Sequence, residues 1–319
     1  MTNWPKIFLG VAAMMAACLS LGQTYPVKPV RIVAADAPGA GDDYIARLVA
    51  GKLSESYGTQ FIVENRPGAG GAIAQMFVAK SQPDGYTLLL GGASMAGAHL
   101  VNASATYNLQ KDFAPISLLE TNTFVMLAHR SVPAKNAAEF VKLARSQPGK
   151  MTFATIGAGQ YPYWAVMLFN GMAGIKAVEV AYKGAPSAIV DLISGQVDYG
   201  FFSMLLAVTS KEKLRLLAVT GTQRAAMLPD VPTMAEAALP GYDMGGFRTM
   251  LAPAGVSREI IVSLNAAIGR ALSTADIKER FLKAGSVATA SNPEEVAKRY
   301  AEKTAVFEKI AKELGLKPQ

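Results

Sequence analysis

Glycine-rich loops that stand between a predicted strand and a predicted helix are the most chemically informative feature of this sequence. Such loops direct backbone N–H groups, and the positive end of a helix dipole, toward one edge of a sheet, where a carboxylate can be bound. One loop of this kind is common in α/β proteins, but five that face one cleft indicate a site for an anionic or polar small molecule. The five loops comprise residues 38–43, 68–71, 91–94, 157–160 and 183–185.

No catalytic or cofactor-binding motif accompanies these loops. The stretch 68–71 lacks the third glycine of a dinucleotide fingerprint, because Ile73 stands in its place. The chain has neither a P-loop nor a Gly-x-Ser-x-Gly nucleophile elbow. One cysteine, Cys18, and two histidines that lie far apart, His99 and His129, do not form a metal-ligand pattern. We therefore expect no cofactor, no metal and no enzymatic activity.

The composition describes a globular protein. Its 319 residues are enough for two domains, and 51% hydrophobic with 17% charged residues indicates a large core. The formal net charge is +7, but the basic residues alternate with acids, as at Lys278, Glu279 and Arg280. This pattern is typical of a solvated surface. We therefore expect no binding of nucleic acid.

The N-terminus has the pattern of an export signal. Lys6 precedes an uncharged, largely apolar stretch over 7–21, which is too short to span a bilayer, and small residues at Ser20 and Gly22 predict cleavage before Gln23. Residues 1–22 are therefore interpreted as a signal peptide and the mature protein as periplasmic. The alternative is a lipobox at 15–18, in which Cys18 would carry a lipid. No later segment is a candidate membrane span.

The elements that must position the loops form two α/β series. Each series alternates short apolar runs with helical patterns, which predicts a largely parallel sheet with right-handed crossovers. The first series comprises strands at 30–34, 61–64 and 86–91 and helices at 43–57 and 72–79. The second comprises strands at 151–155, 177–180, 197–201 and 214–220 and helices at 162–172 and 186–194.

Two extended stretches connect the two series. Residues 116–128 form an apolar stretch broken at 121–123, and residues 247–252 form another, after which helices are predicted at 258–273, 275–284 and 293–314. This order indicates a chain that leaves its first domain, builds the second and returns. Ligands of open α/β sheets bind at the carboxyl ends of the strands, so two facing sheets predict a cleft between the domains.

Several longer motifs resemble the Bug family, the periplasmic solute-binding proteins of tripartite tricarboxylate transporters. The resemblance runs from about residue 25 to residue 312, with the motifs in the order of the family. The motifs are 25–26 (YP), 28–31 (KPVR), 64–71 (ENRPGAGG), 83–89 (PDGYTLL), 112–116 (DFAPI), 182–184 (YKG), 195–198 (GQVD), 228–233 (LPDVPT) and 251–255 (LAPAG).

The resemblance implies a two-domain Venus-flytrap fold of type II with two crossover strands. Domain 1 is expected to comprise residues 23–122 and 248–319, and domain 2 residues 123–247. The resemblance also implies a monomer that captures an organic acid, or a related polar or aromatic small molecule, and delivers this ligand to the membrane permease. The alternative is a ligand sensor that presents its closed form to a membrane sensor kinase.

The first loop departs from the pattern of the family. In other members this loop usually resembles Phe-Pro-Pro-Gly-Gly-Gly-Thr-Asp. Asp36 stands in place of the phenylalanine and Asp42 in place of the threonine. Asp42 is interpreted either as a helix N-cap or as a negative charge that repels a ligand carboxylate. Arg248 is interpreted either as an arginine paired with Asp36 or Asp243, or as the bidentate partner of a ligand carboxylate.

The second domain departs as well, since Gln160, Tyr161 and Tyr163 replace a serine-rich stretch. We expect a pocket that disfavours simple di- and tricarboxylates and prefers a flatter ligand with one acid, an amide or an aromatic ring. The expected ligand-binding residues are Asp36, Gly39, Ala40, Gly41, Asp42, Gly70, Gly71, Ala72, Ser94, Gly157, Gln160, Tyr161, Tyr163, Lys183, Phe202, Ser203 and Arg248.

Overall fold

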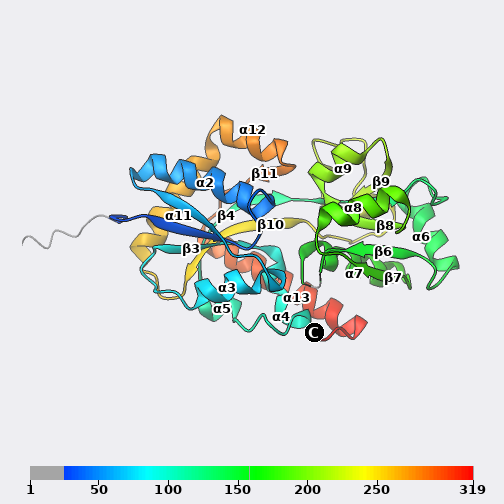
Figure 1. Cartoon of the computed structure of the whole chain (residues 1–319), viewed down its shortest axis with the longest axis horizontal. Coiled ribbons are helices and arrows are strands. Elements are labelled where there is room, and N and C mark those ends of the chain that lie inside the picture. The colour runs from blue at the N-terminus through cyan, green and yellow to red at the C-terminus, as the bar shows by residue number, and fades with distance from the viewer. Residues whose placement is uncertain (1–24, 158, 319) are drawn as a thin grey trace, which may run out of the picture.

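The computed structural model describes residues 25–157 and 159–318, and it contains two sheets that lie side by side along the long axis (Figure 1). We call the part around the first sheet lobe 1 and the part around the second lobe 2. The sheet of lobe 1 has the order β11-β4-β10-β3-β1-β2. Its strands are β1 (Val30–Ala34), β2 (Phe61–Asn65), β3 (Thr87–Gly92), β4 (Phe113–Asn122), β10 (Gly246–Pro253) and β11 (Ser286–Ala288).

The first α/β series folds as its pattern predicts. β1 pairs in parallel with both β2 and β3, and α2 (Gly41–Tyr57) buries Ile45, Val49 and Leu53, which lie at helical spacing. The prediction of parallel pairing does not extend to the whole sheet, because β10 runs antiparallel to β3 and β4. The remaining elements of this region are η1 (Ala69–Gly71), α3 (Ala72–Ala79), η2 (Ala93–Ala96), α4 (Ala98–Val101) and α5 (Leu109–Asp112).

Lobe 2 contains a five-stranded sheet of order β7-β6-β8-β5-β9. β6 is parallel to β7 and β8, whereas β5, which enters from lobe 1, is antiparallel to β8 and β9. The strands are β5 (Phe124–His129), β6 (Thr152–Thr155), β7 (Val178–Ala181), β8 (Tyr199–Ser203) and β9 (Leu214–Val219). The helices are α6 (Ala137–Ser146), α7 (Tyr161–Ala173), α8 (Ala185–Ser194), α9 (Met204–Ser210) and α10 (Met234–Ala237).

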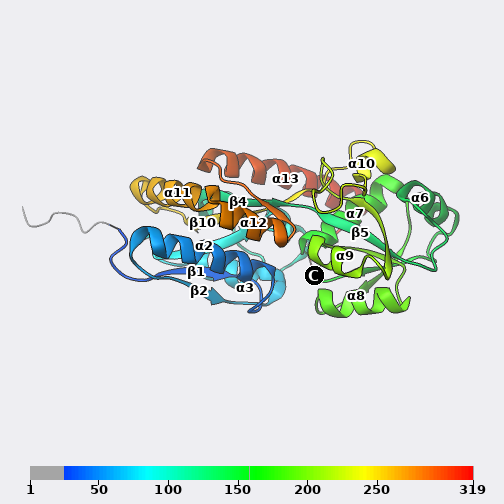
Figure 2. The same cartoon turned by 90° about the horizontal axis from the view of Figure 1, so that it is seen from above.

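The chain passes between the lobes twice, at Thr123, inside the first predicted extended stretch, and at Gly245, two residues before the second. The antiparallel strands arise here, because β4 leaves lobe 1 and β10 returns to it beside β4. α11 (Arg258–Ser273), α12 (Ala275–Lys283) and α13 (Pro293–Leu314) then complete the described chain. Figures 1 and 2 both show α13 extending from lobe 1 to lobe 2.

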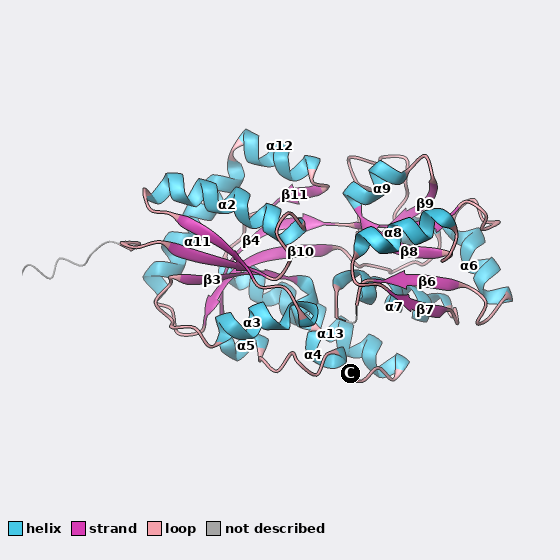
Figure 3. Cartoon of the chain, in the orientation of Figure 1, coloured by secondary structure: helices cyan, strands magenta, loops and turns pink. Residues whose placement is uncertain are grey.

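α13 packs on both lobes. Its Tyr300 contacts Phe247 of β10 edge to face, at 5.2 Å between ring centroids, and its Phe307 stacks on Trp164 of α7 at 4.5 Å. One cluster of buried apolar side chains consequently includes residues of both lobes, such as Leu118 and Tyr199. Figure 3 shows helices on both faces of each sheet.

No single helix in the described ranges combines the length and the apolar character that a membrane span requires. Taken together, α11 and α12, which are bent against each other, have the length and apolar composition of a membrane span, and this resemblance rests on length and composition only.

Candidate functional site

The loop between β1 and α2 is organised by Asp36. Its carboxylate accepts a hydrogen bond from the backbone N–H of Asp42 at 3.1 Å, so Asp36 occupies one of the donors in the first turn of α2. The N-cap position belongs to Ala40, and Asp42 lies in the first turn, so the interpretation of Asp42 as the N-cap is wrong. The turn before α2 is closed instead by Asp43, whose carboxylate accepts from the N–H of Gly39 at 2.8 Å.

Arg248 joins this loop to the sheet. Its Nε lies 2.5 Å from Oδ1 of Asp42, and its Nη1 forms an ion pair with Glu120. The predicted partners of Arg248 were Asp36 or Asp243, and that prediction is wrong because the register of β10 places Arg248 opposite Glu120 on β4. Gly41 lies against the remaining Nη2, which approaches within 3.0 Å of the position that a Cβ would take.

Glu120 is the functional residue that the sequence interpretation missed. Its side chain is fully buried and accepts hydrogen bonds from Ser286 Oγ at 2.6 Å and Asn122 Nδ2 at 2.9 Å, besides the ion pair with Arg248. The signal was present, because an acid inside an apolar strand requires a buried partner. Two carboxylates, Asp42 and Glu120, therefore pair with one guanidinium, and Asp36 contacts the backbone N–H of Asp42.

The electrostatics of this network raise the pKa of the Asp36 carboxyl group. Burial raises the pKa of Asp36 to about 6, and the nearby carboxylate of Asp42 adds to the effect. Burial disfavours the charged form of Arg248, but Glu120 and Asp42 outweigh this effect and raise the pKa of the guanidinium. Arg248 is thus held as a cation whose Nε and Nη1 are already engaged.

The other loops of lobe 1 lie at the carboxyl ends of β2 and β3. Gly70 and Gly71 have φ of +61° and +96°, which favours glycine, and they lead into Ala72 at the beginning of α3. Ser94 lies half-buried in η2. A residue not predicted from the sequence, Gln75, is buried on α3 next to Gly71, and its Oε1 has no partner among the described residues.

The first loop of lobe 2 reaches lobe 1. Gly159 lies against Val101 of α4, and the N–H of Gln160, the N-cap residue of α7, donates to the carbonyl of Gly157. Tyr161 is buried and points to the crossover, because its hydroxyl donates to the carbonyl of Gly245 at 2.7 Å. This contact engages the hydroxyl of Tyr161 in holding the hinge.

The remaining residues expected in lobe 2 differ in exposure. Lys183 and Ser203 are exposed, and Tyr163 is buried, which raises the pKa of its hydroxyl. Phe202 lies in the core of lobe 2, with its ring against Gly200. These contacts do not show an open aromatic face at Phe202, and its role in ligand binding stays a prediction.

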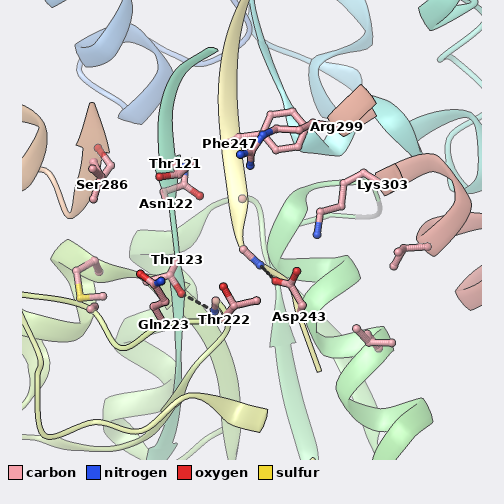
Figure 4. A pocket seen from close by; sticks show the side chains of 18 of the residues that line it. Thr121, Asn122, Thr123, Thr222, Gln223, Asp243, Phe247, Ser286, Arg299 and Lys303 are labelled. Atoms are coloured by element: carbon pink, nitrogen blue, oxygen red, sulfur yellow. Dashed lines mark hydrogen bonds between the residues drawn. The ribbon is translucent and has the colours of Figure 1, made fainter. Parts of the chain in front are cut away.

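A large cavity lies elsewhere, beside the two crossovers. It has a volume of about 890 Å³, and none of the expected ligand-binding residues lines it (Figure 4). Its walls are residues 121–123, residues 221–227, Asp243 and the face of α13 that carries Arg299 and Lys303. We call this cavity the hinge groove. In the described ranges, no group of three or more His, Cys, Asp and Glu side chains is arranged to hold a metal ion.

Two α/β lobes joined by two crossovers, with glycine-rich loops after the strands, define a two-domain binding protein of the Venus-flytrap class. A family model described as "Tripartite tricarboxylate transporter family receptor" matches residues 45–316. The chain belongs to this receptor family, TctC, which includes the Bug proteins, as its motifs indicate. This is a family of solute-binding receptors and not of enzymes.

Two curated relatives cover nearly the whole chain. The UPF0065 protein in the tcbD-tcbE intergenic region of Pseudomonas sp. (strain P51) is 32% identical over 98% of this chain and 94% of its own length. BugT of Bordetella pertussis is 30% identical over 97% of this chain and 94% of its own length.

Solved structures agree with this fold. A protein of R. palustris, solved with adipate, has a TM-score of 0.84 and 30% identity and covers 92% of this chain and 100% of its own. MatC from Rhodopseudomonas palustris, solved with bound malate, has a TM-score of 0.80 and 31% identity and covers 90% of this chain and 99% of its own. The periplasmic binding protein BugD has a TM-score of 0.80 at 28% identity, over 92% of this chain and 100% of its own.

Proposed function

We propose that this protein is a periplasmic receptor that captures a small organic acid, or a related amide or aromatic compound, between its two lobes. It then delivers the ligand to the permease of a tripartite tricarboxylate transporter. The observation that carries the proposal is the network at Arg248, which anchors the β1–α2 loop beside the crossover where a ligand would contact both lobes. Relatives solved with adipate and malate support the choice of an acid.

The expected ligand-binding residues form the proposed site at the carboxyl ends of the strands. In lobe 1 this site comprises the loop from Asp36 to Asp42, the loop before Ala72, Ser94 and Arg248. In lobe 2 it comprises the loops that contain Gln160, Lys183 and Ser203. Because Asp42 and Glu120 already pair with Arg248, and Asp36 adds a third acid to the same loop, we propose that the site binds ligands with one carboxylate better than di- and tricarboxylates.

The domain boundaries are part of the same proposal. We propose that residues 23–122 and 248–319 move as one domain and residues 123–247 as the other. Sheet membership supports this division, since β4 ends at Asn122 and β5 begins at Phe124. β10 begins at Gly246, two residues before the proposed return at 248.

A thermal-shift screen over mono-, di- and tricarboxylates, their amides and aromatic acids tests the proposed function. A ligand at a hundred times its Kd adds about 2.7 kcal/mol to the free energy of unfolding. Small-angle scattering with the best compound then tests lobe closure, for which a smaller radius of gyration is expected. If no organic acid raises the melting temperature, or if purified protein converts the compound it binds, the proposal is wrong.

Transport tests the proposed partner. Deleting the gene should abolish uptake of the radiolabelled ligand, and so should deleting the permease genes. Normal uptake combined with a lost transcriptional response to the ligand would instead indicate a sensor that signals to a membrane kinase.

A further inference from the structure

The hinge groove combines the chemistry of a binding site with a place outside the proposed ligand site. Figure 4 shows Thr121, Asn122 and Thr123 on one crossover and Phe247 on the other, with Arg299 and Lys303 extending from α13. A volume of about 890 Å³ lies in the range of small-molecule sites.

Lys303 differs from the other basic residues that line this groove. Its side chain is partly buried, and no carboxylate lies within 4.0 Å of its Nζ among the described residues. Other cations that line the groove do have such partners: Arg299 pairs with Glu295 at 2.9 Å and Lys309 with Glu313 at 3.9 Å. An ammonium that is partly removed from water without a counter-ion is a favourable place for an anion.

Burial lowers the pKa of Lys303, and the charge of Arg299 contributes in the same direction, whereas Asp243 and Glu302 oppose it. The centroid of the Tyr161 ring lies 5.9 Å from the Nζ. Figure 4 shows the Lys303 side chain pointing toward the side of the groove where Asp243 lies. The two charges thus face each other without forming an ion pair.

The far wall is acidic and polar. Asp243 accepts a hydrogen bond from the N–H of Gly245 at 2.9 Å, which fixes its carboxylate at the end of lobe 2. Thr222 and Gln223, beside it, are exposed in the groove wall. A second carboxylate on a ligand would meet Asp243 and be repelled, whereas an ammonium or hydroxyl group would be attracted.

We propose that the hinge groove is a second small-molecule site, which takes a short carboxylate with an adjacent hydrogen-bond donor, of the α-amino acid type. The carboxylate binds at Lys303, with Arg299 one turn away on the same helix face. The ammonium group lies toward Asp243. Support for this second site comes from the groove alone, whichever ligand binds at the loops at the strand ends.

Occupancy of the groove is coupled to the arrangement of the lobes. The groove is lined by both crossovers, by α13 and by the 221–227 segment of lobe 2, so a change in the angle between the lobes changes its walls. A ligand that binds one arrangement more tightly stabilises it, and the coupling is reciprocal between the two sites.

Calorimetric titration with L-alanine, and with propionate as its analogue without an ammonium group, tests the proposal. We expect saturable binding of alanine and weaker binding of propionate. Lys303→Met should weaken the binding of alanine about tenfold or more, since it removes a charge-assisted contact. Asp243→Asn should abolish the preference for alanine over propionate. Lys298→Met, which removes an exposed cation of the same helix outside the groove, is the matched control and should bind alanine as the wild type does.

Trp164 supplies a local readout. It stacks on Phe307 of α13 near the groove, and it is the sole tryptophan of residues 23–319, the expected mature chain. Alanine should change its emission with the same midpoint as in calorimetry. If alanine binds equally well to wild type and to Lys303→Met, or if neither calorimetry nor emission detects saturable binding, the groove is not such a site.

Discussion

Arg248 and Glu120 are register partners on neighbouring antiparallel strands, and their side chains form an ion pair where the chain leaves lobe 1. Glu120 is fully buried, whereas the side chain of Arg248 remains 23% exposed. The sheet therefore fixes the arginine from one side, while Asp42 connects it to the β1–α2 loop from the other. A substitution at either strand position acts on the stability of the protein and on the shape of the proposed site together.

Arg248→Met should destabilise the protein by about 3 kcal/mol, because it leaves the carboxylate of Glu120 buried without its counter-charge. Urea unfolding monitored by circular dichroism measures the loss. Adding Glu120→Gln to this variant should restore part of the stability, since the uncompensated charge is removed. An additive loss in the double variant would show that the pair is not coupled.

The pKa of Asp36 predicts how stability depends on pH. Its folded pKa of about 6 lies above the unfolded value of about 4, so the folded state binds more protons between these values. The contribution of Asp36 to stability is therefore fully present below about pH 4 and is lost as the pH rises through about 6. Asp43 acts in a separate window, because the hydrogen bond from Arg47 outweighs the effect of burial and lowers the pKa of Asp43 to about 2.

Asp36→Asn removes this dependence, so the urea midpoint of the variant should change less between pH 4.5 and pH 7 (roughly the window of the shift) than that of the wild type. Glu308→Gln, at an exposed position of α13, serves as the control and should keep the wild-type profile. Identical profiles for Asp36→Asn and wild type would contradict the raised pKa.

Asp42→Thr should widen the range of ligands. The substitution removes one carboxylate and frees Nε of Arg248, so affinity for malate or citrate is expected to rise by about tenfold or more. Isothermal titration calorimetry measures the change, with the exposed Asp84→Thr as control. Equally weak binding before and after the change would assign Asp42 a purely structural role.

Phe307→Ala should destabilise the protein by about 3 kcal/mol or more, because a fully buried ring that stacks on Trp164 is lost. The emission of Trp164 should also shift toward longer wavelength, as water gains access. Phe281→Ala, in the separate core of lobe 1 that includes α11 and α12, should destabilise similarly and leave the emission unchanged. An unshifted emission in Phe307→Ala would show that α13 does not shield Trp164.

Processing of the N-terminus is tested by mass spectrometry of protein from the native cell envelope. Residues 1–24 lie outside the described residues, so the expectation rests on Lys6, the apolar stretch and the small residues before Gln23. A soluble chain that begins near Gln23 is expected. An acylated chain that begins at Cys18 would establish a lipoprotein instead.

Most of the fold could be predicted because the chain alternates clear patterns. β1, α3, α11 and α13 have the predicted bounds, since turn residues and caps mark their ends. Several elements had no such pattern. β11 comprises only three residues, and α9 begins directly after β8 without a turn between them. The antiparallel pairing of β4 with β10 depends on contacts between segments more than a hundred residues apart.

The site was less predictable than the fold. Gly39, Gly71 and Gly157 have the positive φ values that make such glycine loops possible, and this is a local property that a sequence pattern can indicate. The partner of Arg248 is not local, because it depends on the strand register that brings Glu120 opposite. The side-chain direction of Tyr161 depends in the same way on the position of Gly245.

The continuous apolar cluster that passes through α13 has a consequence for how the molecule melts. Because Tyr300 packs on lobe 1 and Phe307 on lobe 2, within the same helix, neither lobe can lose its packing without exposing part of the core of the other. The two lobes are therefore expected to denature cooperatively, in one heat-absorption peak whose calorimetric and van't Hoff enthalpies agree.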